Sequence, residues 1–235
     1  MSLGVFFVDF SIIENETTLK SKEKYIKDDY FNLLVQYAVK FHDCYEAHDL
    51  IKNLFELYSI NEYESFFENK LLSNNKNNEI CFEIYSLFCE WKPYTYYNVG
   101  NCRGAFLEEF IYHLLKKIYT TDNIYKEANI LLDNYSSHTW DVIIIFEDLL
   151  KAIECKFSSY SIQIKHINLI KGFKNKFNNF NVYLVSYDYK DAIQDALTII
   201  TNNNTDDILK MINIISIENL IEDNPFDIIK TQSSN

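Results

Sequence analysis

The sequence predicts an α/β protein with a central mixed β-sheet flanked by helices, joined to a mainly helical N-terminal region. Apolar residues recur at helical spacing from about residue 22 to residue 91, which indicates consecutive amphipathic helices. After residue 104, helical segments alternate with short runs rich in Val, Ile, Phe and Tyr, and this alternation is typical of an α/β core. With 235 residues, 48% of them hydrophobic, the chain is long enough to bury a substantial core.

The N-terminal region is predicted to be an accessory unit of residues 1–95. Residues 4–13 alternate in a way that predicts a strand, and the polar run at residues 73–78 predicts a loop. Pro93 discourages continuation of the last helix, so the boundary is expected there. The helical periodicity rests on three sets of residues: Phe31, Leu34, Val35 and Ala38; Leu50, Leu54, Leu57 and Tyr58; and Ile80, Ile84, Leu87 and Phe88.

The predicted core, residues 96–235, opens with a helix that starts after Gly104. A hairpin follows, with strands at 140–146 and 151–157 and a turn at 147–148. The remaining segments predict a helix at 161–177, a strand at 181–187, a helix at 191–200, a strand at 212–217, a short helix from 218 and a frayed tail at 230–235. The apolar stripe of the first helix consists of Leu107, Phe110, Ile111, Leu114, Leu115 and Ile118.

Composition limits the functional classes. The net charge of −12 counts against a generic nucleic-acid binder, yet residues 151–180 contain six Lys and one acid, a net of +5. This basic stretch is either a solvated helix face or a phosphate track. The five cysteines include no CxxC pair, which favours reduced thiols in a cytoplasmic protein over a disulfide framework or a zinc site. No apolar run reaches transmembrane length, so no membrane association is expected.

The strongest candidate site lies in the hairpin. Side chains alternate along a strand, so Glu154 and Lys156 share one face and Cys155 points into the core. Pairing of the two strands would bring Asp141 beside Glu154. Two carboxylates and one ammonium would then meet in a small site that can hold a divalent cation and a nucleophilic water.

These residues resemble the PD-(D/E)XK nuclease superfamily, nearest to its restriction-endonuclease-like and resolvase-like members, over residues 103–222. Gly104 followed by Glu108, then Asp141, then Glu154-Cys155-Lys156 match its pattern in order, with Trp140 where Pro often precedes the Asp. The resemblance implies a restriction-endonuclease-like core and a Mg²⁺- or Mn²⁺-dependent endonuclease acting on nucleic acid, most simply DNA. It assigns catalysis to Glu108, Asp141, Glu154 and Lys156.

The chemistry of these groups agrees with such a reaction. Asp141, Glu154 and the backbone carbonyl of Cys155 offer the hard oxygen ligands that Mg²⁺ prefers. Lys156 would orient or deprotonate the attacking water, and burial that lowers the pKa of its ammonium would favour the role of base. The candidates for binding nucleic acid are Arg103, Gln163, Lys165, Lys171 and Lys174.

A second hypothesis is a non-catalytic scaffold or protein-binding subunit with the same fold. The chain outside residues 151–180 carries a net charge of −17, which suits a basic protein partner better than DNA. The N-terminal helical region could serve either a partner protein or a homodimer.

Overall fold

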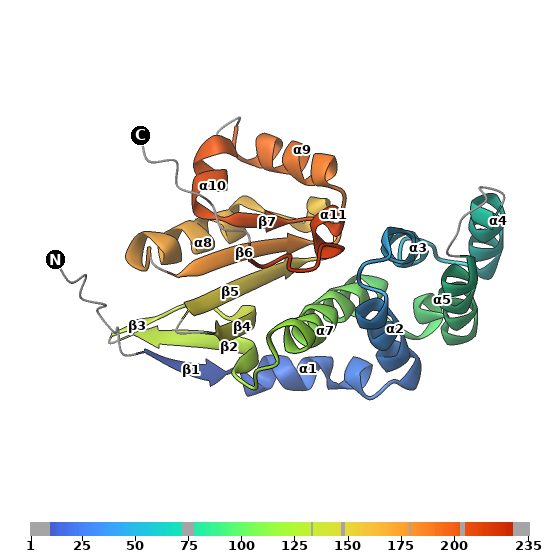
Figure 1. Cartoon of the computed structure of the whole chain (residues 1–235), viewed down its shortest axis with the longest axis horizontal. Helices are drawn as coiled ribbons and strands as arrows, with labels where there is room; N and C mark the ends of the chain where they lie inside the picture. The colour runs from blue at the N-terminus through green and yellow to red at the C-terminus, as the bar shows by residue number, and fades with distance from the viewer. Residues whose placement is uncertain are drawn as a thin grey trace.

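The computed structural model describes residues 10–71, 78–132, 134–146, 149–178, 180–202 and 205–227. Its centre is a mixed seven-stranded sheet in the order β1-β2-β4-β5-β6-β7, with the short β3 paired to β2 (Figure 1). Pairing is antiparallel from β1 to β5 and parallel from β5 to β7. The strands are β1 Phe10–Glu14, β2 Ile124–Leu132, β3 Tyr135–Ser136, β4 Trp140–Phe146, β5 Leu149–Lys156, β6 Asn181–Ser186 and β7 Asn213–Ile215.

Helices cover both faces of this sheet, and a helical group extends beyond it on one side (Figure 1). The N-terminal helices are α1 Glu16–Ile26, α2 Asp29–Lys40, α3 Tyr45–Leu54, α4 Ile60–Leu71, α5 Asn78–Trp91 and α6 Pro93–Tyr96. The later ones are α7 Val99–Tyr119, the 3₁₀ turn η1 Ser159–Ser161, α8 Ile164–Lys176, α9 Lys190–Ile200, α10 Thr205–Met211 and α11 Ile217–Leu220. None of the helices in the described part of the chain is long and apolar enough to cross a bilayer.

Two hydrophobic clusters form the core, one on each face of the sheet. The first joins α2, α3, α5 and α7 to one face, where Val142, Ile153 and Val185 are buried. The second packs α8, α9 and α10 on the opposite face against residues such as Ile143, Ala152 and Val182. The central side chains of β5 are buried on both faces of the sheet.

The predicted α/β class, with a mixed sheet and a helical N-terminal region, is confirmed. Both hairpin strands are present, although β5 begins at Leu149 and ends at Lys156. The first core helix begins at Val99, earlier than predicted, because Asn98 caps it by accepting the Asn101 N–H at 3.0 Å. The sequence analysis missed β2, β3 and α10. The predicted turn at 147–148, most of the 73–78 loop, residues 4–9 and the 230–235 tail lie outside the described residues.

The N-terminal region packs closely on the core. β1 lies at one edge of the sheet, next to β2. The ring of Phe55, the residue after α3, lies 5.3 Å from that of Phe106 on α7 and 5.3 Å from that of Phe157 beyond β5. Aromatic pairs of this kind fix the relative position of the elements that carry them. The division of the chain between residues 95 and 96 stays a prediction.

A buried histidine links α3 to the sheet. His48 is fully buried, with Nδ1 2.6 Å from the Tyr187 hydroxyl and Nε2 2.9 Å from the His42 carbonyl. Burial lowers the pKa of His48 from 6.5 to about 4, so the imidazole is neutral in the folded protein at neutral pH.

This shift predicts that His48 makes stability depend on pH. The unfolded state binds a proton near pH 6.5 and the folded state only near pH 4, so stability present above pH 6.5 is lost as the pH falls through this window. From pH 7 to pH 4.5 the loss due to His48 is about 2–3 kcal/mol. Urea unfolding at both pH values should show a smaller decrease for His48→Gln than for the wild type; equal decreases would contradict the prediction.

Candidate functional site

The site begins where β4 and β5 separate. Their paired residues extend to Val142 and Ile153, and beyond this point the N–H of Cys155 donates to Oδ2 of Asp141 at 2.6 Å. A side-chain carboxylate thus takes the place of a backbone carbonyl at the end of the ladder. The hydrogen bond satisfies the buried amide and fixes the orientation of Asp141.

Three carboxylates converge at this point. Glu108 on α7, Glu127 on β2 and Asp141 on β4 each offer an oxygen atom, and these atoms lie within 4.8 Å of one another. The ammonium of Lys22, on α1, donates to both Glu108 and Glu127. The neighbouring Glu109 does not join the cluster, since it pairs with Lys126 at 2.7 Å. We call Glu108, Glu127 and Asp141 the acidic cluster.

Glu127 reaches the acidic cluster from a distorted strand. Its φ of 48° lies in the left-handed region, although the residues on either side, Lys126 and Ala128, pair regularly with β4. This conformation costs a residue with a Cβ about 1–2 kcal/mol. Such strain at a polar cluster is typical of functional sites.

Glu154 and Lys156 lie beside the acidic cluster. Lys156 Nζ donates to Glu154 Oε1 at 2.6 Å and to the Cys155 carbonyl at 3.0 Å. The other oxygen of Glu154 is buried and has no hydrogen-bond partner among the described residues, but it lies at ion-pair distance, 3.6 Å, from the Nε2 atom of His138. Cys155 is buried in the core, as predicted.

Burial and mutual repulsion perturb these carboxyl groups. Burial, together with the charge of Glu154, raises the pKa of Asp141 from 3.8 to about 7. Burial and the charge of Asp141 raise the pKa of Glu108 well above its usual value, against the opposing effect of Lys22. Burial also opposes ionisation of Glu154, but His138 and Lys156 outweigh it, so the pKa of Glu154 is lowered. Simultaneous ionisation of all these carboxyl groups is therefore unfavourable unless cations balance their charge.

The expected fall in the pKa of Lys156 is wrong for this structure. Burial lowers the pKa of its ammonium, but the carboxylates of Asp141 and Glu154 outweigh burial and raise it. Lys156 is therefore a charged ammonium here, suited to orient a water or balance negative charge rather than to remove a proton.

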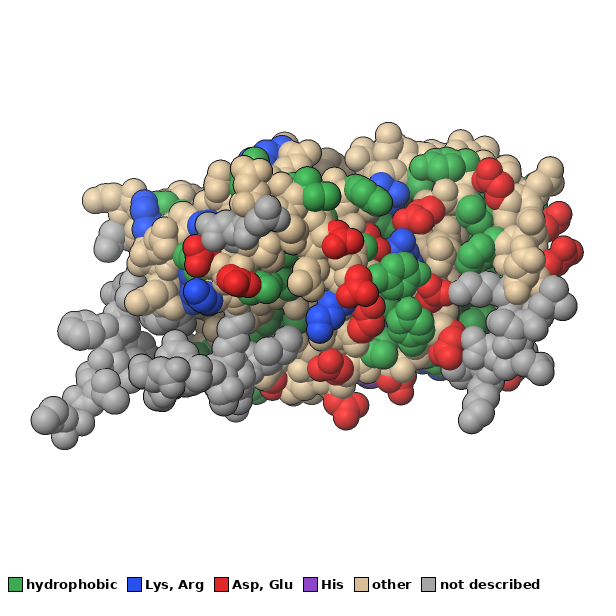
Figure 2. Space-filling model, turned by 90° about the horizontal axis from the view of Figure 1, so that it is seen from above, with side chains coloured by type: hydrophobic (Ala, Val, Ile, Leu, Met, Phe, Trp, Pro, Cys, Tyr) green, Lys and Arg blue, Asp and Glu red, His purple; other side chains and the backbone are tan. Residues whose placement is uncertain are grey.

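A cleft of about 600 Å³ opens from the acidic cluster. Four cationic side chains and one carboxylate line it: Lys22, Lys24, Arg103, Lys156 and Glu108. Arg103, the only arginine of the chain, lies with its guanidinium carbon 5.5 Å from the centre of the Phe157 ring. Acidic side chains are spread over the face of the molecule seen in Figure 2. The cleft is thus locally positive in a chain with a net charge of −12.

The other predicted nucleic-acid-binding residues lie outside this cleft. Gln163 begins α8, where its N–H bonds to Nδ1 of His166, and Lys165 is exposed nearby. Lys174 donates to the carbonyls of Asn178 and Phe180 beyond the end of the same helix. Neither these residues nor Lys171 lines the cleft, so their binding role stays a prediction.

The basic stretch of residues 151–180 is not one continuous surface. Lys151 is buried and bonds to Asp227 at 2.7 Å and to the Tyr119 hydroxyl at 2.6 Å. Lys176 lies over the ring of Tyr135, and of the six lysines only Lys156 lines the cleft. The cations that line the cleft therefore come mainly from α1 and α7, and Lys156 is the one lysine that this stretch contributes.

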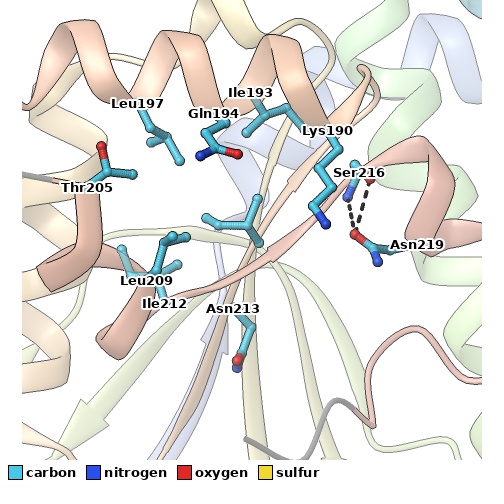
Figure 3. A pocket seen from close by; sticks show the side chains of 11 residues that line it. Lys190, Ile193, Gln194, Leu197, Thr205, Leu209, Ile212, Asn213, Ser216 and Asn219 are labelled. Atoms are coloured by element: carbon cyan, nitrogen blue, oxygen red, sulfur yellow. Dashed lines mark hydrogen bonds between the residues drawn. The ribbon is translucent and has the colours of Figure 1, made fainter. Parts of the chain in front are cut away.

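A second pocket, of about 280 Å³, lies against β7 between α9 and α10 (Figure 3). Its walls are mostly apolar, and at one end Ser216 donates through its N–H and hydroxyl to Oδ1 of Asn219 at 3.2 and 3.1 Å. None of the described residues that line it is a carboxylate, so these residues provide no acidic ligands for a metal ion. The acidic cluster and its cleft are therefore the candidate site.

Sequence reasoning missed Glu127 and Lys22. Glu127 directly precedes the alternating apolar residues Ala128, Ile130 and Leu132, and this short strand signal ahead of the hairpin could have placed it in the sheet. For Lys22 no signal exists in the sequence, because only the folded chain brings α1 to the cluster.

No protein-family model and no curated protein matches the chain. Among solved structures, protein VC1899 from Vibrio cholerae is similar, with a TM-score of 0.44 and 13% sequence identity. The match covers 90% of this chain and 56% of that one, so this chain spans little more than half the length of that protein.

The bond from Asp141 to the sheet predicts different effects of two substitutions. Asp141→Asn keeps an oxygen acceptor for the Cys155 N–H, whereas Asp141→Ala leaves this amide without a partner. The alanine variant should have a free energy of unfolding about 1–3 kcal/mol lower than the asparagine variant. Urea denaturation at pH 7 measures the difference, and equal stabilities would show that the bond contributes little.

Proposed function

We propose that the protein is a metal-dependent nuclease that hydrolyses phosphodiester bonds of nucleic acid. One observation carries the proposal: three carboxylates converge within 4.8 Å beside Glu154 and Lys156, at the edge of a cationic cleft. Carboxylates that bind a cation and cations that bind phosphate are the two requirements for this reaction.

The donor set fits a hard divalent cation such as Mg²⁺ or Mn²⁺. All three groups of the acidic cluster provide oxygen ligands. One further observation supports a cation at this place: the ammonium of Lys22 already bonds to two of the carboxylates. The ligand set that we propose consists of Glu108, Glu127 and Asp141, with Glu154 adjacent. The Cys155 carbonyl, which the sequence also named as a ligand, accepts a hydrogen bond from Lys156 at 3.0 Å in this structure.

The residues that line the cleft would have separate roles in the hydrolysis. A bound metal would activate water and polarise the phosphoryl oxygen. Arg103 and Lys24 would hold phosphate groups in the cleft, and Arg103 offers a bidentate fork for them. Lys156, fixed by Glu154, would orient the water and balance the charge that develops on the phosphoryl group.

The second candidate, a non-catalytic scaffold, is favoured by the acidic surface (Figure 2) and the net charge of −12. A homodimer or a partner protein bound through the N-terminal helices, and a cytoplasmic location, are compatible with either function. A protein that binds metal but cleaves neither DNA nor RNA would support the scaffold.

The nuclease proposal predicts cleavage of DNA oligonucleotides in Mg²⁺ or Mn²⁺, and none in excess chelator. Because each group acts on the metal, the water or the phosphate, Glu108→Gln, Glu154→Gln and Lys156→Met should each lower the rate by about 10²-fold or more. Gel-based cleavage assays on single- and double-stranded DNA and RNA measure the effect.

Glu109→Gln is the matched control for Glu108→Gln. Both residues lie on α7, but Glu109 pairs with Lys126 outside the acidic cluster. Its variant should keep the wild-type rate. Folded proteins in which all four variants cleave at the wild-type rate would exclude this site as the catalytic one.

A further inference from the structure

The cation within the acidic cluster comes from a separate helix. Lys22 lies about two turns into α1, and its ammonium donates to both Glu108 and Glu127. These two carboxylates, with that of Asp141, raise the pKa of Lys22 against the opposing effect of burial. The other lysines in this part of α1 have different contacts: Lys20 pairs with Glu16 at 3.2 Å, and Lys24 lies 4.8 Å from the Tyr25 ring centre.

Glu127, which accepts a hydrogen bond from Lys22, also binds the start of α1. The N–H of Asn15 donates to the Glu127 carbonyl at 2.6 Å, and the Asn15 side chain caps the helix by accepting the Thr18 N–H at 3.2 Å. Glu127 therefore binds α1 twice, through its backbone at the beginning of the helix and through its carboxylate two turns later.

A divalent cation and the Lys22 ammonium would need the same space. Mg²⁺ binds carboxylate oxygens at 2.0–2.1 Å, so an ion bound to all three carboxylates would lie among their oxygen atoms. These atoms are within 4.8 Å of one another, and the ammonium already bonds to two of their carboxylates. Repulsion between the two positive charges would also be strong in such a buried site.

We propose that Lys22 is a built-in counter-cation, which a divalent metal displaces from Glu108 and Glu127 into the neighbouring cleft. The inference rests on the metal site of the proposed function. Lys22 already lines the cleft, together with Lys24, Arg103 and Lys156. After displacement its ammonium joins these cations as a binding group for phosphate. Metal binding and phosphate binding thereby reinforce each other, and in the metal-free protein Glu108 and Glu127 stay paired with an ammonium.

The first test is the affinity of the whole protein for Mn²⁺, measured by calorimetric titration. Lys22→Met keeps a side chain of similar length but removes the competing charge, so it should bind Mn²⁺ at least tenfold more tightly than the wild type. Lys20→Met removes an exposed lysine of the same helix and should leave the affinity unchanged. An affinity of Lys22→Met equal to or below that of the wild type would overturn the proposal.

The second test uses the wild type, so it does not depend on the folding of a variant. Reductive methylation followed by mass spectrometry measures the reactivity of Lys22 relative to Lys20, whose side chains are 21% and 74% exposed. Saturating Mg²⁺ should increase the Lys22-to-Lys20 ratio several-fold, because the displaced ammonium is exposed and no longer ion-paired. An unchanged or lower ratio with the metal site occupied would overturn the proposal.

The two proposals fail in different ways. Nucleic-acid cleavage by a wild type whose Lys22 stays unreactive would overturn the displacement and leave the nuclease intact. Tighter Mn²⁺ binding by Lys22→Met, in a protein that cleaves no nucleic acid, would overturn the nuclease and support the displacement. Absence of Mn²⁺ binding in both the wild type and the variant would overturn both.

Discussion

Three carboxyl groups within 4.8 Å of one another can all be ionised only if positive charge lies among them, and this requirement connects several parts of the fold. Glu108, Glu127 and Asp141 come from α7, β2 and β4, so the sheet and its covering helix converge at their oxygens. α1 adds the ammonium of Lys22. An unpaired buried carboxylate costs far more free energy than a paired one. The ion pairs of Lys22 with Glu108 and Glu127 therefore favour the observed position of α1.

The charges of the molecule are also unevenly distributed. Acidic residues predominate in the chain as a whole, whereas the walls of the cleft combine cations from α1, α7 and β5. An anionic polymer would be repelled by the net negative charge of the chain and attracted by the cations that line the cleft. Both effects would weaken as the salt concentration rises.

The sequence was sufficient for the features that depend on local pattern. The α/β class, the hairpin that carries Asp141 and Glu154, and a preceding helix that contains Glu108 follow from periodicity and spacing, whereas the choice of Glu108 as a site residue came from the family resemblance. β2 was missed because Lys126 and Glu127 interrupt its apolar alternation, and the interruption is the strained segment that brings Glu127 to the site. The position of Lys22 depends on contacts 86 and 105 residues away in the chain, which no local pattern encodes.

The pairing of the Cys155 amide with Asp141 has a consequence for observing this protein in solution. Every other bond of the β4–β5 ladder reports on the sheet, but this amide proton senses the state of a side chain at the centre of the site. Its chemical shift in a ¹⁵N-labelled sample would change when Asp141 ionises. It would also change when a ligand draws the carboxylate away from the amide. The backbone thus contains a native spectroscopic probe that needs neither an attached label nor a substrate.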